Sequence, residues 1–86
     1  MDVNDNFEIE PQHSIEWGRA TWAVKNKTMD TSIRNRYDRD GGFNYAASSE
    51  IPWDDFNIMI LQSIERKHFS QDELQEIVEA IEQLKI

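Results

Sequence analysis

Hydrophobic and polar side chains alternate in the first half of the chain and recur at helical spacing in the second half. Residues 14–25 and residues 31–37 each predict a strand, because the alternation has a period of two. Successive strand residues point to opposite faces, so Trp17, Arg19 and Lys25 fall on one face of the first predicted strand. The pattern therefore favours a small antiparallel sheet at the start of the domain.

Turn-forming residues follow the second predicted strand. The run 38–42 contains Asp-Gly and Gly-Gly, which adopt positive φ at little cost, and it predicts a turn. Residues 43–50 favour a short third strand that ends in a loop. Residues 1–13 are polar and acidic, and we expect either a tail or a short edge segment there.

Two helices are predicted in the second half. The first spans 53–66, with Pro52 at the helix start and acidic residues in the first turn, where they complement the positive end of the helix dipole. Its apolar positions spread so far round the helix that little of it is expected to face solvent; they are Trp53, Phe56, Ile58, Met59, Ile60, Leu61 and Ile64. Such a helix is typically sandwiched or lies in an oligomer interface.

The second helix, at 70–84, has the clearest local signals of the chain. Ser70 and Glu73 match the capping box, in which a hydroxyl and a carboxylate satisfy each other's backbone amides. Apolar residues then recur at helical spacing from Leu74 to Leu84. The expected fold class is α+β, with a small antiparallel sheet of two or three strands followed by two helices packed on one face.

Length limits the chain to one modest core, because 86 residues leave little room for a second. We expect a tail at 1–13 and a single α+β domain at 14–86. The absence of cysteine excludes disulfides and thiolate metal sites, and the acidic start differs from a secretory signal. No apolar run is long enough to span a membrane. We expect a cytoplasmic protein without cofactor or metal and without a membrane partner.

Charge divides the chain into three blocks. Residues 1–16 carry −5, residues 17–39 carry +4 and residues 40–86 carry −7, which sum to the formal −8. A basic, aromatic-bearing centre inside an acidic protein bears on partners and solubility rather than on fold.

The basic block supplies the first candidate site. If the strands pair in the expected register, one sheet face carries Trp17, Arg19, Lys25, Arg34 and Arg36. Cations beside an indole can hold a phosphate-bearing ligand or a nucleotide. The alternatives are a solvated sheet face, or pairing of these cations with the acidic tail and Asp38. Extended nucleic acid is not expected as a partner, because the acids outside the block oppose attraction of a polyanion.

Protein interfaces supply the second candidate. Aromatic residues exceed what a small core easily buries, and Trp, Tyr and Arg often dominate binding. The acidic second half offers a negative surface, although a solvated helix face is the simpler explanation. The candidate interface residues are Trp53, Phe56, Ile58, Met59, Tyr45, Glu76 and Glu79.

No catalytic constellation is visible. His13 and His68 are the only histidines, and neither is paired with a nucleophile in the sequence pattern. The run at 38–42 lacks the later ligands of a calcium loop. We therefore expect no enzyme.

We expect a small non-enzymatic binding protein that acts by protein–protein contact and self-associates through the helix at 53–66. Its size, acidity and lack of cysteine resemble, in general style, the inhibitors that phages and mobile elements use against host defence or regulatory proteins. The alternative is a ligand-sequestering protein that binds a small anion, either a phosphorylated metabolite or a cyclic nucleotide, on the basic strand face.

Overall fold

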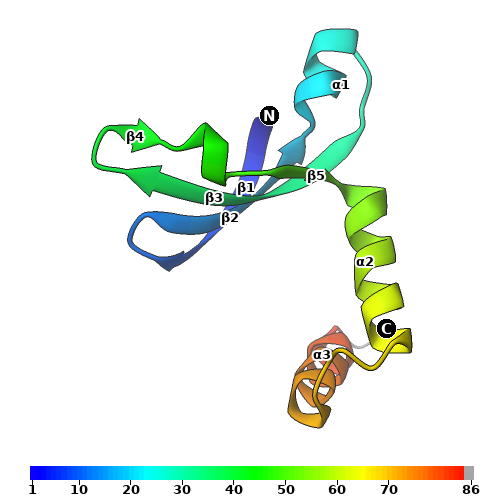
Figure 1. The fold of residues 1–86 in the computed structure, drawn as a ribbon. Coiled ribbons are helices and arrows are strands. Elements are labelled where there is room, and N and C mark those ends of the chain that lie inside the picture. Colours follow the sequence, from blue (N-terminus) through cyan, green and yellow to red (C-terminus); the bar gives the residue numbers. More distant parts are fainter. Residues whose placement is uncertain (85–86) are drawn as a thin grey trace. The chain divides into compact units, whose positions relative to one another are not determined.

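The computed structural model describes residues 1–84 and shows an α+β protein with a five-stranded antiparallel sheet and three α-helices (Figure 1). The α+β class is confirmed, whereas the strand and helix numbers exceed those expected. The chain divides into two compact units, Met1–Phe56 and Asn57–Ile86, which we call the sheet unit and the helical unit. The expected packing of helices on one sheet face, and the expected division at residue 13, stay predictions.

The segment expected as a tail or short edge segment is the edge strand β1 (Asp2–Glu10). It pairs antiparallel with β2 (His13–Arg19) across a turn in which Gln12 has φ 69°. All nine of its residues are exposed, so backbone hydrogen bonds to β2, rather than burial of side chains, order this acidic segment.

The backbone of β1 passes very close to Gly18 of β2. A Cβ at Gly18 would lie 2.9 Å from Cα of Val3 and 2.8 Å from the carbonyl carbon of Asp2. Both distances are shorter than real Cβ contacts, and they involve backbone atoms that cannot rotate away. Glycine is therefore required at this position if the two strands are to pair.

The long strand β3 (Thr31–Arg39) is the centre of the sheet unit. It pairs with β2 on one side and, along its other side, with β4 (Gly42–Phe43) and β5 (Glu50–Pro52). The turn predicted at 38–42 lies at 40–41 between β3 and β4. A short 3₁₀ helix, η1 (Tyr45–Ala47), connects β4 to β5.

The second half of the predicted first strand is instead the helix α1 (Thr21–Asn26). Ala20 and Ala23 are completely buried, and their small side chains allow this turn of helix to lie close against its surroundings. The helix ends at Lys27, which has φ 60° in the left-handed region. Strand β2 therefore stops at Arg19, six residues earlier than predicted.

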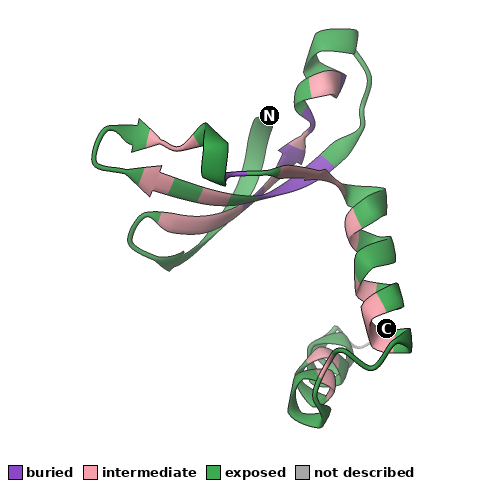
Figure 2. Ribbon diagram, in the orientation of Figure 1, coloured by how far each residue is buried: buried purple, intermediate pink, exposed green. Residues whose placement is uncertain are grey.

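The interior of the described chain is small and unusually polar. Its buried hydrophobic residues are Ala20, Ala23 and Ile33, and its buried polar residues are Glu16, Ser32, Arg34 and Ser48 (Figure 2). Hydrogen bonds among polar groups therefore take a large share in defining the sheet unit.

The helices α2 (Trp53–Glu65) and α3 (Gln71–Gln83) occupy the regions where the sequence predicts helices. The capping box is confirmed: the Ser70 backbone N–H donates to Glu73 at 2.8 Å, and the Glu73 N–H donates to the Ser70 hydroxyl at 3.1 Å. No residue of either helix is buried (Figure 2). Within residues 1–84, no helix is long and apolar enough to cross a membrane.

Candidate functional site

A buried carboxylate holds two arginines on one face of the sheet. Strand register places Glu16 of β2 directly opposite Arg34 of β3, and only 5 % of Glu16 is exposed. Arg34 Nε donates to Glu16 Oε1 at 2.8 Å, and Arg34 Nη2 lies 2.7 Å from the same oxygen. Arg36 Nη1 donates to Glu16 Oε2 at 3.2 Å. One carboxylate thus compensates two cations that lie two positions apart on β3.

Asp38 completes this network by accepting a hydrogen bond from Arg36 Nε at 3.0 Å. The bond to Asp38 raises the pKa of Arg36, burial opposes the rise, and the bond to Glu16 adds to it. Arg36 is therefore cationic at neutral pH. Two arginines and two acids leave this cluster without net charge.

Aromatic rings adjoin the two arginines. The guanidinium carbons of Arg34 and Arg36 each lie 4.6 Å from the ring centroid of Phe43. Tyr45 meets Phe43 edge-on, with ring centroids 4.1 Å apart, and 80 % of Tyr45 is exposed. Cations stack favourably on aromatic faces, so Phe43 helps to hold both guanidinium groups in place.

These side chains line an open cavity of about 560 Å³, which we call the arginine hollow. It is lined by Met1, Thr21, Arg34, Arg36, Phe43, Tyr45, Ser48 and Glu50. It combines guanidinium donors, an exposed ring and hydroxyl groups. Such convergence of aromatic and polar groups is typical of small-molecule sites.

Glu50 forms one wall of the hollow and is held by three hydrogen bonds. The Ser32 hydroxyl donates at 2.7 Å, the Thr21 hydroxyl at 2.7 Å and the Thr21 backbone N–H at 2.8 Å. Burial raises the pKa of Glu50, but the bonds from Ser32 and Thr21 outweigh it, and the net pKa is lowered. The carboxylate is thus ionised and its acceptor capacity is largely used within the fold.

The structure does not bring the five residues of the predicted basic face together. Trp17 lies opposite Ile33 and Arg19 opposite Thr31, so both occupy the face away from Arg34 and Arg36. Arg19 donates to the backbone oxygens of Thr28 and Ala23 at 2.9 and 3.3 Å, and Lys25 belongs to α1. Glu16 and Ser14, rather than Trp17 and Arg19, share the sheet face of Arg34 and Arg36.

The candidate interface residues are distributed over both units. In the sheet unit, Tyr45 lies in η1, Trp53 is 42 % exposed, and Phe56 is half-buried with its ring centroid 5.4 Å from that of Trp53. In the helical unit, Ile58 and Met59 of α2 are more than half exposed. Glu76 and Glu79 lie on exposed positions of α3.

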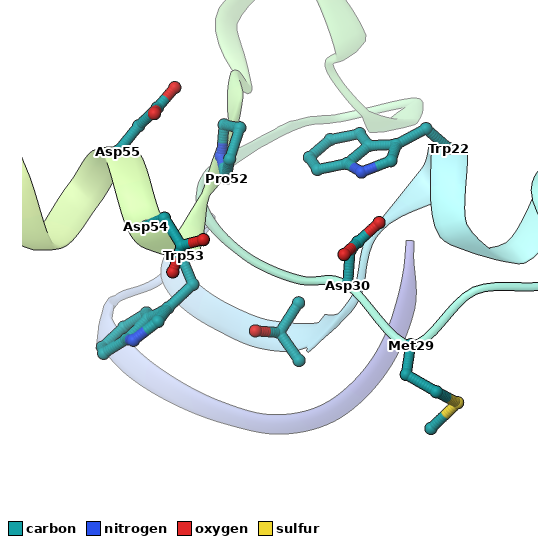
Figure 3. Close-up of a pocket in the computed structure, with 8 residues that line it drawn as sticks. Trp22, Met29, Asp30, Pro52, Trp53, Asp54 and Asp55 are labelled. Atoms are coloured by element: carbon teal, nitrogen blue, oxygen red, sulfur yellow. The ribbon is translucent and has the colours of Figure 1, made fainter.

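A second open pocket, of about 430 Å³, lies where β5 meets the start of α2 (Figure 3). Trp22 and Trp53 stand at its sides, and its lining includes the acidic residues Asp30, Asp54 and Asp55 (Figure 3). Asp54 and Asp55 occupy the first turn of α2, where they interact with the positive end of the helix dipole. A role in stabilising the start of the helix therefore accounts for these two acids.

The pairing of Glu16 with Arg34 is the main feature that sequence reasoning missed. The two residues lie 18 positions apart, so only the strand register reveals their contact. Like charges that face each other across a sheet are destabilising, and this could have indicated that an acidic residue lies between the arginines. Within the described part of the chain, no group of three or more His, Cys, Asp or Glu residues is placed to hold a metal ion.

Comparison with known proteins found no matching family model, no matching curated protein and no matching solved structure.

Proposed function

We propose that this chain is a small non-enzymatic binding protein that acts by protein–protein contact through its helical unit. The observation that carries the proposal is the number of large apolar side chains that α2 and α3 leave in water. Six large apolar residues of the two helices are each between 44 % and 69 % exposed: Ile58, Met59, Leu61, Val78, Ile81 and Leu84. We refer to this set of residues as the helical apolar surface.

Exposure of apolar side chains to water is unfavourable in free energy. Removal of apolar surface from water stabilises a protein or complex by roughly 25 cal/mol per Å². Soluble proteins that keep several large apolar residues exposed on one element commonly use them to bind a partner. Two amphipathic helices without one buried residue therefore support a binding role better than a purely structural one.

Charge indicates the chemistry of the partner. Residues 57–84 contain six acidic residues against Arg66 and Lys67, which leaves −4 with neutral histidine. On α3, a shallow hollow of about 370 Å³ is lined by apolar Phe69, Ile77 and Ala80 together with Glu73 and Glu76. A mixed lining of this kind suits the aliphatic stem and cationic head of lysine or arginine. The partner we propose is a protein with an apolar patch bordered by basic residues.

The specific form we propose is an inhibitor of a host defence or regulatory protein, acting in the cytoplasm. Its support is the small size, the net charge of −8 and the absence of cysteine. Occlusion of a basic functional surface needs no catalytic group, only shape and opposite charge.

The experiment is cross-linking of the tagged full chain in its own cells, followed by purification of the captured protein and titration with variants. Ile58→Lys should abolish binding, because it places a charge in the apolar contact. Glu76→Lys with Glu79→Lys should weaken binding about tenfold and reduce its dependence on salt. Met29→Lys is the matched control, since Met29 is 81 % exposed but lies in the sheet unit.

Wild-type affinity in both helical variants would contradict the proposal. Analytical ultracentrifugation of the purified chain tests whether a second copy of the chain, instead of a different protein, binds at this surface. If the chain forms a stable dimer that Ile58→Lys or Met59→Lys dissociates, the helical apolar surface is the self-association interface that the sequence predicts. A heterologous partner at this surface would then be wrong.

A further inference from the structure

The two arginines of the arginine hollow retain hydrogen-bond donors that the fold does not use. Arg34 engages Glu16 through Nε and Nη2, and Arg36 engages Asp38 and Glu16 through Nε and Nη1. Among residues 1–84, no acceptor pairs with Nη1 of Arg34 or with Nη2 of Arg36. Within the same part of the chain, every fully buried side-chain nitrogen has a partner, so these two nitrogens are not fully buried. Both arginines line the hollow, which is open to solvent.

Both guanidinium groups are fixed before a ligand arrives. Arg34 is 91 % buried, and both arginines are held by Glu16 and by the Phe43 ring. Donors that are already oriented lose little conformational entropy when they bind. The hollow therefore presents two neighbouring N–H donor groups in a preset arrangement.

A flat surface stands beside these donors. Tyr45 lines the same hollow and leaves 80 % of its surface in solvent. Its edge-to-face contact with Phe43 orients the ring and leaves a face on which a planar ligand can stack. Stacking of a base on an aromatic side chain is a frequent mode of nucleotide recognition.

Charge favours the base of a nucleotide over its phosphate as the group that enters. The arginines are balanced by Glu16 and Asp38. The N-terminal ammonium of Met1 also lines the hollow, and ionised Glu50 balances it. A phosphate would therefore meet no excess of positive charge, whereas an uncharged acceptor edge needs only the free donors. The chain's net charge of −8 also opposes an extended nucleic acid.

We propose that the arginine hollow binds the base of a free guanine nucleotide. Guanine presents O6 and N7 as adjacent acceptors, which match the two free donor groups of Arg34 and Arg36. Adenine replaces the acceptor O6 with an amino donor, which would face a guanidinium donor. The ring stacks on Tyr45, and the phosphate remains at the solvent side. This site is separate from the helical apolar surface.

The first measurement is titration of the full chain by calorimetry with GMP, guanosine, AMP and inorganic phosphate. GMP and guanosine should bind with similar affinity, AMP should bind at least tenfold more weakly, and inorganic phosphate should not bind. Absence of GMP binding would overturn the proposal. So would equal affinity for AMP, binding of phosphate alone, or binding only of a guanine-containing oligonucleotide.

Two variants locate the site, and neither breaks the bond between Glu16 and Arg34. Tyr45→Ala should weaken GMP binding about tenfold by removing the stacking surface, whereas Tyr45→Phe should retain it. Arg36→Gln should weaken the binding of GMP about tenfold and reduce the preference of the hollow for GMP over AMP. Arg39→Gln is the matched control, because it removes the same charge from an exposed residue outside the hollow. Wild-type GMP affinity in Tyr45→Ala and Arg36→Gln, with unchanged circular dichroism, would overturn the assignment.

Discussion

The sheet unit and the helical unit depend on interactions of very different range along the chain. In the sheet unit, Glu16 reaches Arg34 across 18 positions, and Ser32 reaches Glu50 across another 18. In the helical unit, Ser70 and Glu73 are three residues apart. Long-range polar contacts define the first unit, and local sequence defines the second.

This difference teaches where each unit is vulnerable. Buried charges in the sheet unit are stabilising only while every partner is present, because an unpaired buried charge is strongly unfavourable. Exposed helices lose only the local bond that is removed, since no side chain of α2 or α3 is buried. Substitutions should therefore have large effects in the sheet unit and small ones in the helical unit.

The largest effect is expected for Glu16→Gln. The variant leaves two arginines without their shared carboxylate, and it should lower the free energy of unfolding by about 3–5 kcal/mol. Urea denaturation followed by tryptophan fluorescence measures this loss. Glu8→Gln, which makes the same change on the exposed strand β1, is the control. Equal losses in the two variants would show that the buried network is not what stabilises the sheet.

A smaller effect is expected for Ser70→Ala. Removing the cap should cost about 1 kcal/mol, confined to α3. Amide hydrogen exchange should show lower protection at the start of α3 and unchanged protection in β2 and β3. Ser49→Ala, at an exposed position before β5, is the matched control. Equal loss of protection in the sheet would contradict the independence of the two units.

The smallest effect is expected in the pH dependence of stability at Glu50, because this measurement concerns the titration of one group and not the removal of a buried partner. Burial raises the pKa of Glu50, but hydrogen bonds from Ser32 and Thr21 lower it overall below the usual 4.5. A lowered folded-state pKa contributes stability above the unfolded-state value, and this stability is lost as the pH falls through the folded-state value. The free energy of unfolding, measured by urea denaturation between pH 3 and 6, should fall less steeply with acid in Glu50→Gln. A slope identical to that of the wild type would contradict the assignment.

Local signals explain why the helical unit was predictable from sequence. The capping box at Ser70 and Glu73 and the apolar spacing from Leu74 onward each depend on residues a few positions apart. The same holds for the turn at 38–42, which lies in the sheet unit. Their physical basis is hydrogen bonding within one turn of chain, which a single sequence displays directly. These elements accordingly lie where they were predicted.

The sheet unit was harder to predict because its elements depend on distant partners. Phe7 and Ile9 alternate with polar residues in β1, but the alternation is short and both side chains are exposed, so it does not reflect burial of one face. Pairing with β2 orders this strand. In α1, Trp22, Ala23 and Val24 resemble strand residues, and a helix of six residues is too short to display its period.

The candidate basic face was predicted in part. The alternation of side chains between the two faces of a strand correctly groups Arg34 with Arg36. This alternation does not say which residues of a neighbouring strand share that face. The assumed alignment placed Arg19 beside them, where like charges would repel. The observed register places Glu16 there instead, and this choice both removes the repulsion and leaves the donors that line the arginine hollow.

The passage of β1 over Gly18 also constrains how this sequence can vary. Even the single methyl group of alanine would collide with backbone atoms of Asp2 and Val3. In a library of all single substitutions, position 18 should therefore tolerate fewer amino acids than the exposed turn position Gly41, where a Cβ meets nothing within 4 Å. The fold thus restricts the amino acid at position 18 more strictly than it restricts many of the neighbouring side chains.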